Sequence, residues 1–376
     1  MMMRMLATVV LVVVLALGAG PALAADPAPA KLGIGLGLTG PLAFLSQQYL
    51  RGLRAAVAEA NAEGGVGGGR KLELIERDHK GIPSEAVAVA KRFIEQDRVD
   101  IVDLDLPSTV PIAVQAVTKQ ARIAQITGYG FATGVVEQNN PYHFRTCTNV
   151  DLLAGALGDV MSGIPGNKTI AMLAPNDDYG RGAIKALTAA LEKKGSTKVV
   201  FADYYERDQT DFTAILLKMK SLNPDSLYID VRWPANVTVL KQMAELGLKK
   251  TLFGSVNFFN SKLVERAGAL LEGAYMSVSW APVFPDAASK KFVEVYQRLH
   301  KELPDDSAGL GWTAGLTVVA ALRAAGPGAD REAIRAALAK LEVQAPQGVI
   351  KFDARGDARV PAHVLQFKNG VYQLVK

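Results

Sequence analysis

The chain has 376 residues, of which 49% are hydrophobic and 21% are charged. This composition supplies a large hydrophobic core and excludes a disordered or fibrous protein, and the length suggests two domains. The formal net charge of +5 is a mild excess without a dense Lys/Arg stripe, which argues against nucleic-acid binding.

The first 25 residues have the pattern of an export signal. Arg4 gives a short positive start, residues 6–17 form an apolar run, and residues 22–24 read Ala-Leu-Ala. This order predicts a signal peptide spanning residues 1–24 that is cleaved near Ala24, and hence a periplasmic mature protein. The alternative is an uncleaved N-terminal anchor, but the apolar run is shorter than the about 20 residues that a membrane span needs.

Strand and helix patterns alternate through the next hundred residues. Short apolar runs predict strands, and apolar residues spaced by three or four predict helices that begin near residues 46, 84 and 111. The expected strands are residues 31–38, 71–77, 99–104 and 122–126. Such an alternation is typical of a parallel sheet with helices on its faces.

The same alternation restarts after Gly166, with expected strands at residues 168–174, 198–202, 226–231 and 251–255. Three successive helices follow at about residues 287–302, 308–325 and 330–341, and then two short strands at 348–352 and 362–367. Asn369-Gly370 predicts a tight hairpin turn. We therefore expect an α/β protein of two three-layer, Rossmann-like lobes with parallel sheets, which share the C-terminal part.

The strand ends indicate where a ligand would bind, because ligands of open parallel sheets bind beyond the carboxyl ends of the strands. Hydroxyl groups and backbone amides in these loops could hold a carboxylate, and aromatic rings could enclose an apolar group. Taken singly, each residue could equally serve ordinary loop packing. The candidates are Phe44, Ser46, Ser108, Thr109, Tyr129, Phe131, Tyr179, Arg232, Trp233 and Asn257.

Catalytic motifs are missing from the sequence. The run Gly35–Gly40 matches a dinucleotide fingerprint, but Pro41 follows its last glycine, and we interpret it as a glycine-rich turn close to a ligand. Asp103 and Asp105 could form an acid/base pair or bind a ligand cation or local amides, and the single Cys147 is expected to be a buried, inert thiol. The four histidines show no metal-ligand spacing, so we expect no catalysis, cofactor or metal.

The order of several short motifs resembles the periplasmic substrate-binding proteins of ABC transporters, of the branched-chain amino-acid (leucine/isoleucine/valine) type. The resemblance extends over nearly all of the mature chain. It rests on Thr39-Gly40-Pro41-Leu42, Arg51-Gly52, Asn61-Ala62-Glu63-Gly64-Gly65-Val66, Gly69 to Leu74, Arg77-Asp78, Ser108-Thr109, Asn140 to Thr146, Asp178 to Gly182, Gly348 to Asp353 and Gly356-Asp357.

Membership of this family implies a type I periplasmic binding fold with a three-crossing hinge. We place the crossings near Thr146, Ser277 and Pro361, so that residues 26–145 plus 277–361 form the N-terminal lobe and 146–276 plus 362–376 the C-terminal lobe. The resemblance further implies a monomer that closes on a small ligand. The closed form would then dock on a membrane permease.

The resemblance also assigns roles to single residues. Ser108 falls on the serine that binds the ligand carboxylate, and residues 127–131, with Thr127 and Tyr129, fall on the loop that completes this clamp. Phe131 stands where the family has a threonine, which implies an altered grip. Tyr179 and Arg232 fall on aromatic wall positions of the second lobe, with Trp233 beside the latter.

The family's acid that pairs with a ligand ammonium is not found near Asn257, since residues 255–260 contain no Asp or Glu. A buried ammonium without a counter-charge is costly. Asp105 could replace that acid from the other lobe, which keeps an amino-acid ligand. Alternatively Arg232 favours a second anionic or carbonyl group, and hence a carboxylic acid, an aromatic acid or an amide; we favour this second interpretation.

Three functions remain open on the sequence. The first is the solute-binding component of an ABC importer, without catalysis. The second is an exported sensor that uses the same cleft but reports closure to a signalling partner. The third is an exported oxidoreductase or hydrolase, based on Gly35–Gly40 or on Asp103 and Asp105.

Overall fold

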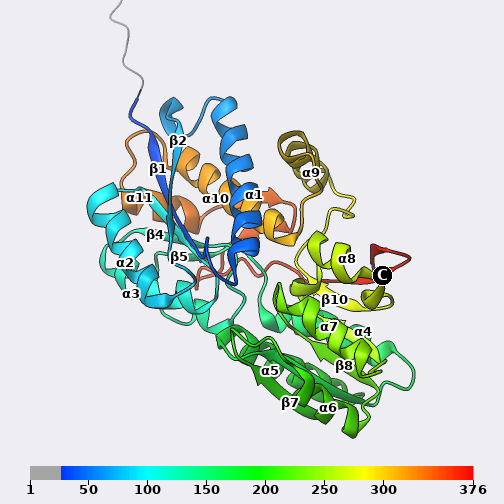
Figure 1. The fold of residues 1–376 in the computed structure, drawn as a ribbon. Coiled ribbons are helices and arrows are strands. Elements are labelled where there is room, and N and C mark those ends of the chain that lie inside the picture. The colour runs from blue at the N-terminus through cyan, green and yellow to red at the C-terminus, as the bar shows by residue number, and fades with distance from the viewer. Residues whose placement is uncertain (1–26, 376) are drawn as a thin grey trace, which may run out of the picture.

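Two open sheets organise the chain, and each is covered by helices on both faces (Figure 1). The computed structural model describes residues 27–375, so the expected signal peptide lies outside the described residues. The first sheet has five parallel strands in the order β2-β1-β3-β4-β5. These strands are β1 Ala30–Leu36, β2 Leu72–Asp78, β3 Ile101–Leu104, β4 Ala124–Thr127 and β5 His143–Arg145.

The second sheet has seven strands in the order β14-β13-β10-β9-β8-β6-β7. The five from β6 to β10 are parallel, whereas the C-terminal hairpin β13–β14 adds antiparallel strands to β10. They are β6 Thr169–Pro175, β7 Lys198–Tyr205, β8 Ser226–Ile229, β9 Thr251–Gly254, β10 Tyr275–Val278, β13 His363–Lys368 and β14 Val371–Leu374. A small antiparallel pair, β11 Glu342–Ala345 and β12 Gly348–Lys351, stands apart.

Three layers form in each lobe, as the sequence predicts. In the first lobe α2 and α3 pack together, and α1, α10 and α11 form the other helical layer. In the second lobe α4 packs on α5, and α7 packs between α6 and α8. The helices are α1 Ala43–Ala62, α2 Pro83–Arg92, α3 Thr109–Gln120, α4 Val150–Gly163, α5 Asp178–Lys194, α6 Thr213–Leu222, α7 Ala235–Glu245, α8 Ser261–Ala267, α9 Ala287–His300, α10 Asp306–Ala325 and α11 Arg331–Ala339.

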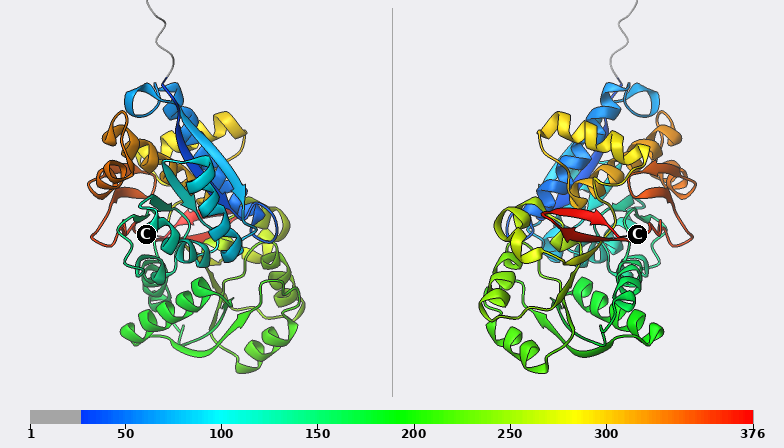
Figure 2. Two further views of the ribbon diagram at one scale, coloured as in Figure 1. Left: turned by 90° about the vertical axis from the view of Figure 1, so that its left-hand side faces the viewer. Right: turned by 90° about the vertical axis from the view of Figure 1, so that its right-hand side faces the viewer.

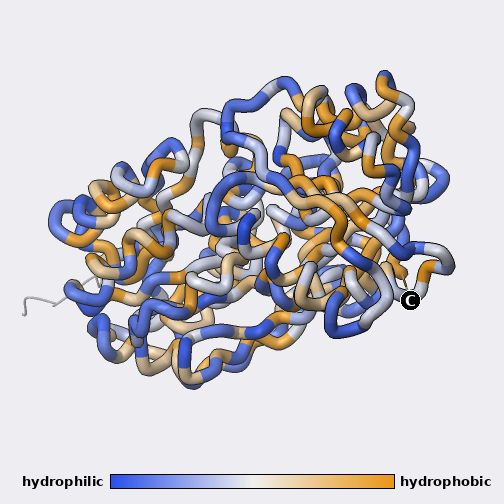
Figure 3. Tube along the Cα trace, turned by 90° about the horizontal axis from the view of Figure 1, so that it is seen from below, coloured by the Kyte–Doolittle hydropathy of each residue, from blue (hydrophilic) through white to orange (hydrophobic). Residues whose placement is uncertain are grey.

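Along the helices at the periphery, hydrophobic and hydrophilic residues alternate, as expected for amphipathic helices that cover a sheet (Figure 3). α10 is the exception, because it is apolar on nearly every side. Among the described residues it is the one helix long and apolar enough to span a membrane, and 72% of its apolar window is buried inside the protein. That burial is typical of the core helix of a folded domain.

The chain passes between the two sheets three times. It leaves the first sheet after β5, returns from the second sheet after β10, and enters the second sheet again between β12 and β13. The side views show the lobes stacked one above the other with these passages between them (Figure 2). The two sheets therefore turn the carboxyl ends of their parallel strands toward a common interface.

Several element boundaries differ from the sequence expectations for local reasons. The expected strand 226–231 ends at Ile229, and the helix expected to begin near residue 84 begins at Pro83, with Ile82 at its N-cap position. The strand β5 escaped prediction because its three residues are too few to show a period. At the C-terminus the hairpin turn is confirmed, since Asn369 and Gly370 both have positive φ, of 54° and 78°.

Candidate functional site

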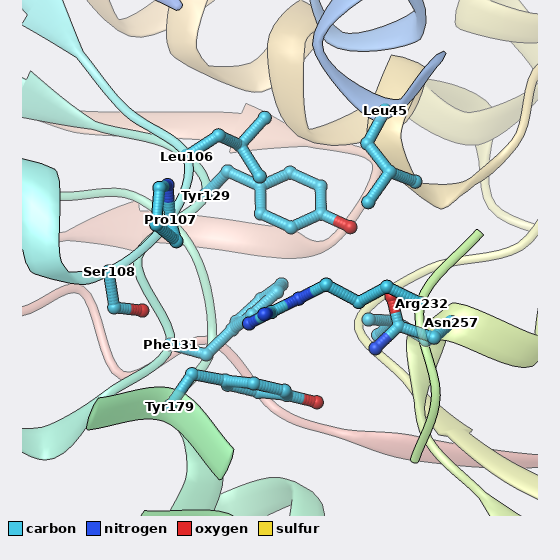
Figure 4. A pocket seen from close by; sticks show the side chains of 10 residues that line it. Leu45, Leu106, Pro107, Ser108, Tyr129, Phe131, Tyr179, Arg232 and Asn257 are labelled. Atoms are coloured by element: carbon cyan, nitrogen blue, oxygen red, sulfur yellow. The ribbon is translucent and has the colours of Figure 1, made fainter. Parts of the chain in front are cut away.

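A small, narrow cavity lies between the lobes at the carboxyl ends of their strands (Figure 4). The first lobe contributes the start of α1, the β3–α3 connection and the loop after β4. The second lobe contributes α5 and the loops after β8 and β9. The lining residues are Leu45, Leu106, Pro107, Ser108, Tyr129, Phe131, Tyr179, Arg232, Val256 and Asn257.

Aromatic rings form a continuous wall that joins the lobes. The ring centroids of Tyr129 and Phe131 are 5.0 Å apart, and those of Phe131 and Tyr179 are 6.0 Å apart across the interface. All three side chains are nearly fully buried. These tilted arrangements suit aromatic quadrupoles and present flat apolar surfaces to the cavity.

Arg232 is the one charged residue among the ten that line the cavity. Its side chain extends between Tyr129 and Tyr179 toward the side where Ser108 lies (Figure 4), and its guanidinium lies 5.4 Å from the Tyr179 ring centroid. Burial disfavours its charge, but the ion pair with Asp177, at 2.7 Å, outweighs burial and raises the pKa of Arg232. The guanidinium therefore stays cationic inside the cavity.

Asp177 is the partner of Arg232 in this ion pair and is also the N-cap residue of α5. Its second carboxylate oxygen accepts the Gly180 amide at 3.0 Å. Burial opposes its ionisation, but the charge and hydrogen bond of Arg232 prevail and lower the pKa of Asp177. Because the pair uses one guanidinium edge, other N–H groups of Arg232 are left for a ligand.

A buried acid that the sequence analysis missed lies behind the cavity wall. The Asp230 carboxylate accepts four hydrogen bonds, at 2.6–2.9 Å, from the hydroxyls of Tyr179, Tyr228 and Ser255 and from the Asn257 side-chain amide. These donors satisfy the carboxylate and separate it from the cavity. The sequence analysis placed Asp230 inside the expected strand 226–231, so it was not considered as a site residue. Because β8 ends at Ile229, Asp230 is the first residue beyond the strand, where ligands are expected to bind.

Ser108 lies at the start of α3, with its hydroxyl toward the cavity (Figure 4). Its Oγ accepts the Ala132 amide at 3.3 Å, which ties it to the loop that carries Phe131. The hydroxyl proton stays available as a donor. In the first turn of α3 the Val110 amide is already bonded to the Pro107 carbonyl and residue 111 is a proline without N–H, so the hydroxyl is the main donor here. This end of the cavity can therefore hold an anionic oxygen.

Two candidates lie behind the wall rather than in it. The Asp105 carboxylate accepts the amides of Gly128 and Tyr129 at 2.6 and 3.0 Å and shapes the loop after β4 from within. Burial raises the pKa of Asp105, as it does that of the neighbouring Asp103, to whose carboxylate Tyr49 donates at 2.6 Å. The Thr127 hydroxyl contacts the His143 ring at 3.0 Å inside the first lobe.

Phe44, Thr109 and Trp233 lie toward the rim of the interface. Thr109 and Trp233 line a second, larger outer space that also reaches Arg232. The ring of Phe44 packs against that of Trp233 across the lobes in a tilted arrangement, with ring centroids 5.6 Å apart. Ser46 is fully buried and lines neither the inner cavity nor the outer space. The sequence therefore named six of the ten lining residues of the inner cavity and three of the outer space, with Arg232 common to both. It missed the apolar Leu45, Leu106, Pro107 and Val256.

The glycine-rich run approaches the protein itself rather than a ligand. A side chain at Gly35 would meet Leu104, and one at Gly37 would meet the backbone of Gly81. Within residues 27–375, no group of three or more His, Cys, Asp or Glu is arranged to hold a metal ion. Cys147 is buried, as expected, and burial raises the pKa of its thiol.

Comparison with known proteins agrees with this architecture. The family model described as periplasmic binding protein matches residues 29–370. The chain belongs to that family. An amino acid binding protein of Pseudomonas aeruginosa is 28% identical over 330 residues, which cover 87% of each chain.

Two solved structures show how variable the ligand is on this fold. The branched-chain amino acid transporter substrate binding protein LivJ of Streptococcus pneumoniae, in complex with isoleucine, has a TM-score of 0.84 and 22% identity, and the match covers 93% and 99% of the two chains. A solute binding protein of an ABC transporter from R. palustris, in complex with benzoate, has a TM-score of 0.84 and 23% identity, with 92% and 95% covered. The same fold thus binds isoleucine in one of these proteins and benzoate in the other.

Proposed function

We propose that this protein is the extracytoplasmic solute-binding component of an ABC importer, and that it carries a small carboxylate-bearing solute, an aromatic acid by preference, to a membrane permease. It works by binding and release without catalysis, as a monomer. The lobes predicted at residues 26–145 plus 277–361 and 146–276 plus 362–376 close about their three crossings. The observation that supports this ligand class is the position of the cationic Arg232 between aromatic rings.

The charge of the cavity favours an anion. Arg232 faces the side where the Ser108 hydroxyl offers a further donor. A carboxylate placed between them receives charge-assisted hydrogen bonds, which are about twice as strong as neutral ones. The rings of Tyr129, Phe131 and Tyr179 then enclose the apolar body of the ligand.

The same cavity disfavours the ammonium group of an amino acid. Asp230 is close to the expected position of an ammonium partner, but its carboxylate is occupied by four donors. Asp105 is held by two backbone amides and is absent from the lining. An ammonium would therefore enter beside Arg232 with no available counter-charge, at a high desolvation cost.

A matched ligand set tests this function. Thermal unfolding is followed with benzoate, benzamide, phenylalanine and isoleucine, because a ligand that binds only the folded state raises the unfolding temperature. We expect stabilisation in the order benzoate, benzamide, then the two amino acids. Benzamide keeps the ring but loses the charge, whereas phenylalanine keeps the ring and adds the ammonium.

Each outcome has a definite meaning. Stabilisation by isoleucine above benzoate would overturn the ligand class and favour Asp105 as the ammonium partner. Failure of all four, and of a broader panel of organic acids and amides, would remove the support for solute transport.

A further inference from the structure

Arg207 makes a direct contact between the lobes outside the ligand cavity. It follows β7 in the second lobe, and its guanidinium donates to two consecutive backbone carbonyls of the first lobe, those of Gly81 at 3.1 Å and Lys80 at 2.9 Å. We call these two hydrogen bonds the rim clasp. A planar guanidinium suits such a pair of parallel acceptors.

The rim clasp lies far from the passages between the lobes. β2, which leads into the Lys80–Gly81 loop, is the edge strand opposite β5, where the first passage begins. β7, which leads into Arg207, is the edge strand opposite the β10–β13 side, where the other two passages attach. Rotation about these passages therefore moves the clasp partners apart more than groups near the passages.

The accepting loop is held ready by bonds within the first lobe. Lys80 and Gly81 both have positive φ, of 56° and 68°. The Lys80 amide donates to Asp78 Oδ1 at 2.7 Å, and the Gly81 amide donates to His79 Nδ1 at 3.0 Å. Since His79 Nδ1 accepts, its Nε2 carries the proton and donates to the Asp105 carbonyl at 3.0 Å.

This preparation lowers the entropic cost of the contact. The carbonyls keep their direction whether or not Arg207 is present, because His79 is buried and bonded on both ring nitrogens. Closure must then order only the Arg207 side chain. Leu42 and Trp233 line the adjoining outer space, so the contact forms part of a closed rim.

We propose that the rim clasp is a closure determinant: it holds the two lobes together without any ligand and so sets how long a bound solute stays. This inference rests on the proposed solute-binding function for its physiological meaning, but the clasp involves protein groups alone. The apparent affinity for the solute scales with the population of the closed form that binds it tightly. Release of the solute requires the lobes to open and the rim clasp to break. Loss of the clasp is thus expected to act on the dissociation rate.

The contact can be broken from either lobe. Arg207→Ala removes the donor. Gly81→Ala acts from the other side, because a Cβ there would lie 2.8 Å from Arg207 Nη2 and the positive φ adds strain. Arg181→Ala is the matched control, since this exposed arginine bonds only to Asn176 and Asp178 of its own lobe.

The experiment measures lobe separation in the ligand-free, full-length mature protein. Spin labels are attached to Lys91→Cys in α2 and Lys218→Cys in α6, both exposed sites, while the buried Cys147 does not compete for label. We expect a short-distance population in the parent protein. Arg207→Ala and Gly81→Ala should each lower the closed-to-open ratio about fivefold, the effect of losing an ordinary solvent-accessible hydrogen bond. Arg181→Ala should leave the ratio unchanged.

A parent protein that is entirely open without ligand, or an Arg207→Ala distribution equal to the parent's, would overturn the inference. So would an equal shift with Arg181→Ala. These outcomes are independent of the benzoate measurements, which decide the proposed function. If benzoate binds, Arg207→Ala should raise its dissociation rate by the same factor; an unchanged rate would show that the clasp does not govern residence.

Discussion

The buried ion pair between Arg145 and Asp357 joins the first and third passages between the lobes. Arg145 Nε and Nη2 donate to the two carboxylate oxygens of Asp357 at 2.9 and 2.8 Å, and both side chains are only 1% exposed. The same guanidinium donates to the carbonyls of Gly130 and Ala132, which flank Phe131. One arginine thus connects two inter-lobe segments with the loop that lines the cavity.

Breaking this pair should destabilise the protein strongly. Asp357→Ala leaves the Arg145 charge buried without its partner, and we expect the free energy of unfolding to fall by about 3–5 kcal/mol. Urea denaturation measures the change. The control is Lys351→Ala at the exposed Lys351–Glu342 pair, where a change of at most about 1 kcal/mol is expected. A similar small change at Asp357 would contradict the structural role of the pair.

Arg232 should determine the affinity for carboxylates. Arg232→Gln keeps a polar but shorter side chain and removes the charge, and benzoate binding should weaken about 10- to 100-fold, as measured by calorimetry. Binding of neutral benzamide should change much less. Arg266→Gln is the control, because this arginine lies over the Trp233 ring at the outer rim and does not line the inner cavity. Equal losses for benzoate and benzamide would point to misfolding of the cavity instead of lost charge recognition.

Asp177 should act in the opposite direction, since it competes with an anionic ligand for Arg232. Asp177→Asn can still cap α5 but removes the negative charge 2.7 Å from the guanidinium. We expect benzoate to bind about threefold to tenfold more tightly, because the cation is then less neutralised. Titration calorimetry at low and high salt gives the measurement, and weaker binding by the variant would show that the ion pair positions Arg232.

The hydroxyl of Tyr179 should matter for stability and its ring for binding. Tyr179→Phe removes one of the four donors to Asp230 and should lower the free energy of unfolding by about 1–3 kcal/mol. Benzoate affinity should stay within about threefold, because the aromatic surface is kept. Tyr179→Ala removes both contributions. Comparable benzoate binding by the Ala variant would exclude the ring from the ligand wall.

Asp306 should make the free energy of unfolding depend on pH, and Asp306→Asn should remove this contribution. Burial raises its pKa from the ordinary 3.8 to about 7, although Ser279 Oγ and the Trp280 amide donate to it at 2.7 and 2.8 Å. The folded state therefore holds the proton more tightly than the unfolded state. The corresponding stability is complete below about pH 4 and is lost as the pH rises through about 7, a change of about 4 kcal/mol for this carboxyl.

Asp306→Asn can accept the same hydrogen bonds without titrating. Urea unfolding of variant and wild type at about pH 5 and about pH 8 compares the two slopes. We expect the variant to lose less stability at the higher pH. Burial also raises the pKa of Asp305 to about 7, whereas burial and Arg145 lower that of His143 to about 3. The charge of Asp306 also contributes to the raised pKa of Asp305, so Asp306→Asn reduces both contributions, whereas that of His143 does not involve Asp306. Parallel curves would refute the role of Asp306.

The sequence by itself determined the fold class and the strand ends near which the cavity lies. Apolar periodicity is a local property, so runs such as residues 168–174 reveal their element without knowledge of any partner. The carboxyl-end rule then placed Ser108, Tyr179 and Arg232 near one another before any coordinates. Motif order added the family, which the match over residues 29–370 confirms.

Only the tertiary structure decided which polar groups are available to a ligand. Asp105 and Asp230 look equivalent along the chain, yet one is bonded to amides of its own lobe and the other is covered by Tyr179 and Asn257. A buried carboxylate takes whatever donors surround it, and those donors come from segments distant in sequence. The Arg207 contact could not be predicted from the sequence for the same reason. Its acceptors are backbone carbonyls of the other lobe, which every residue type has.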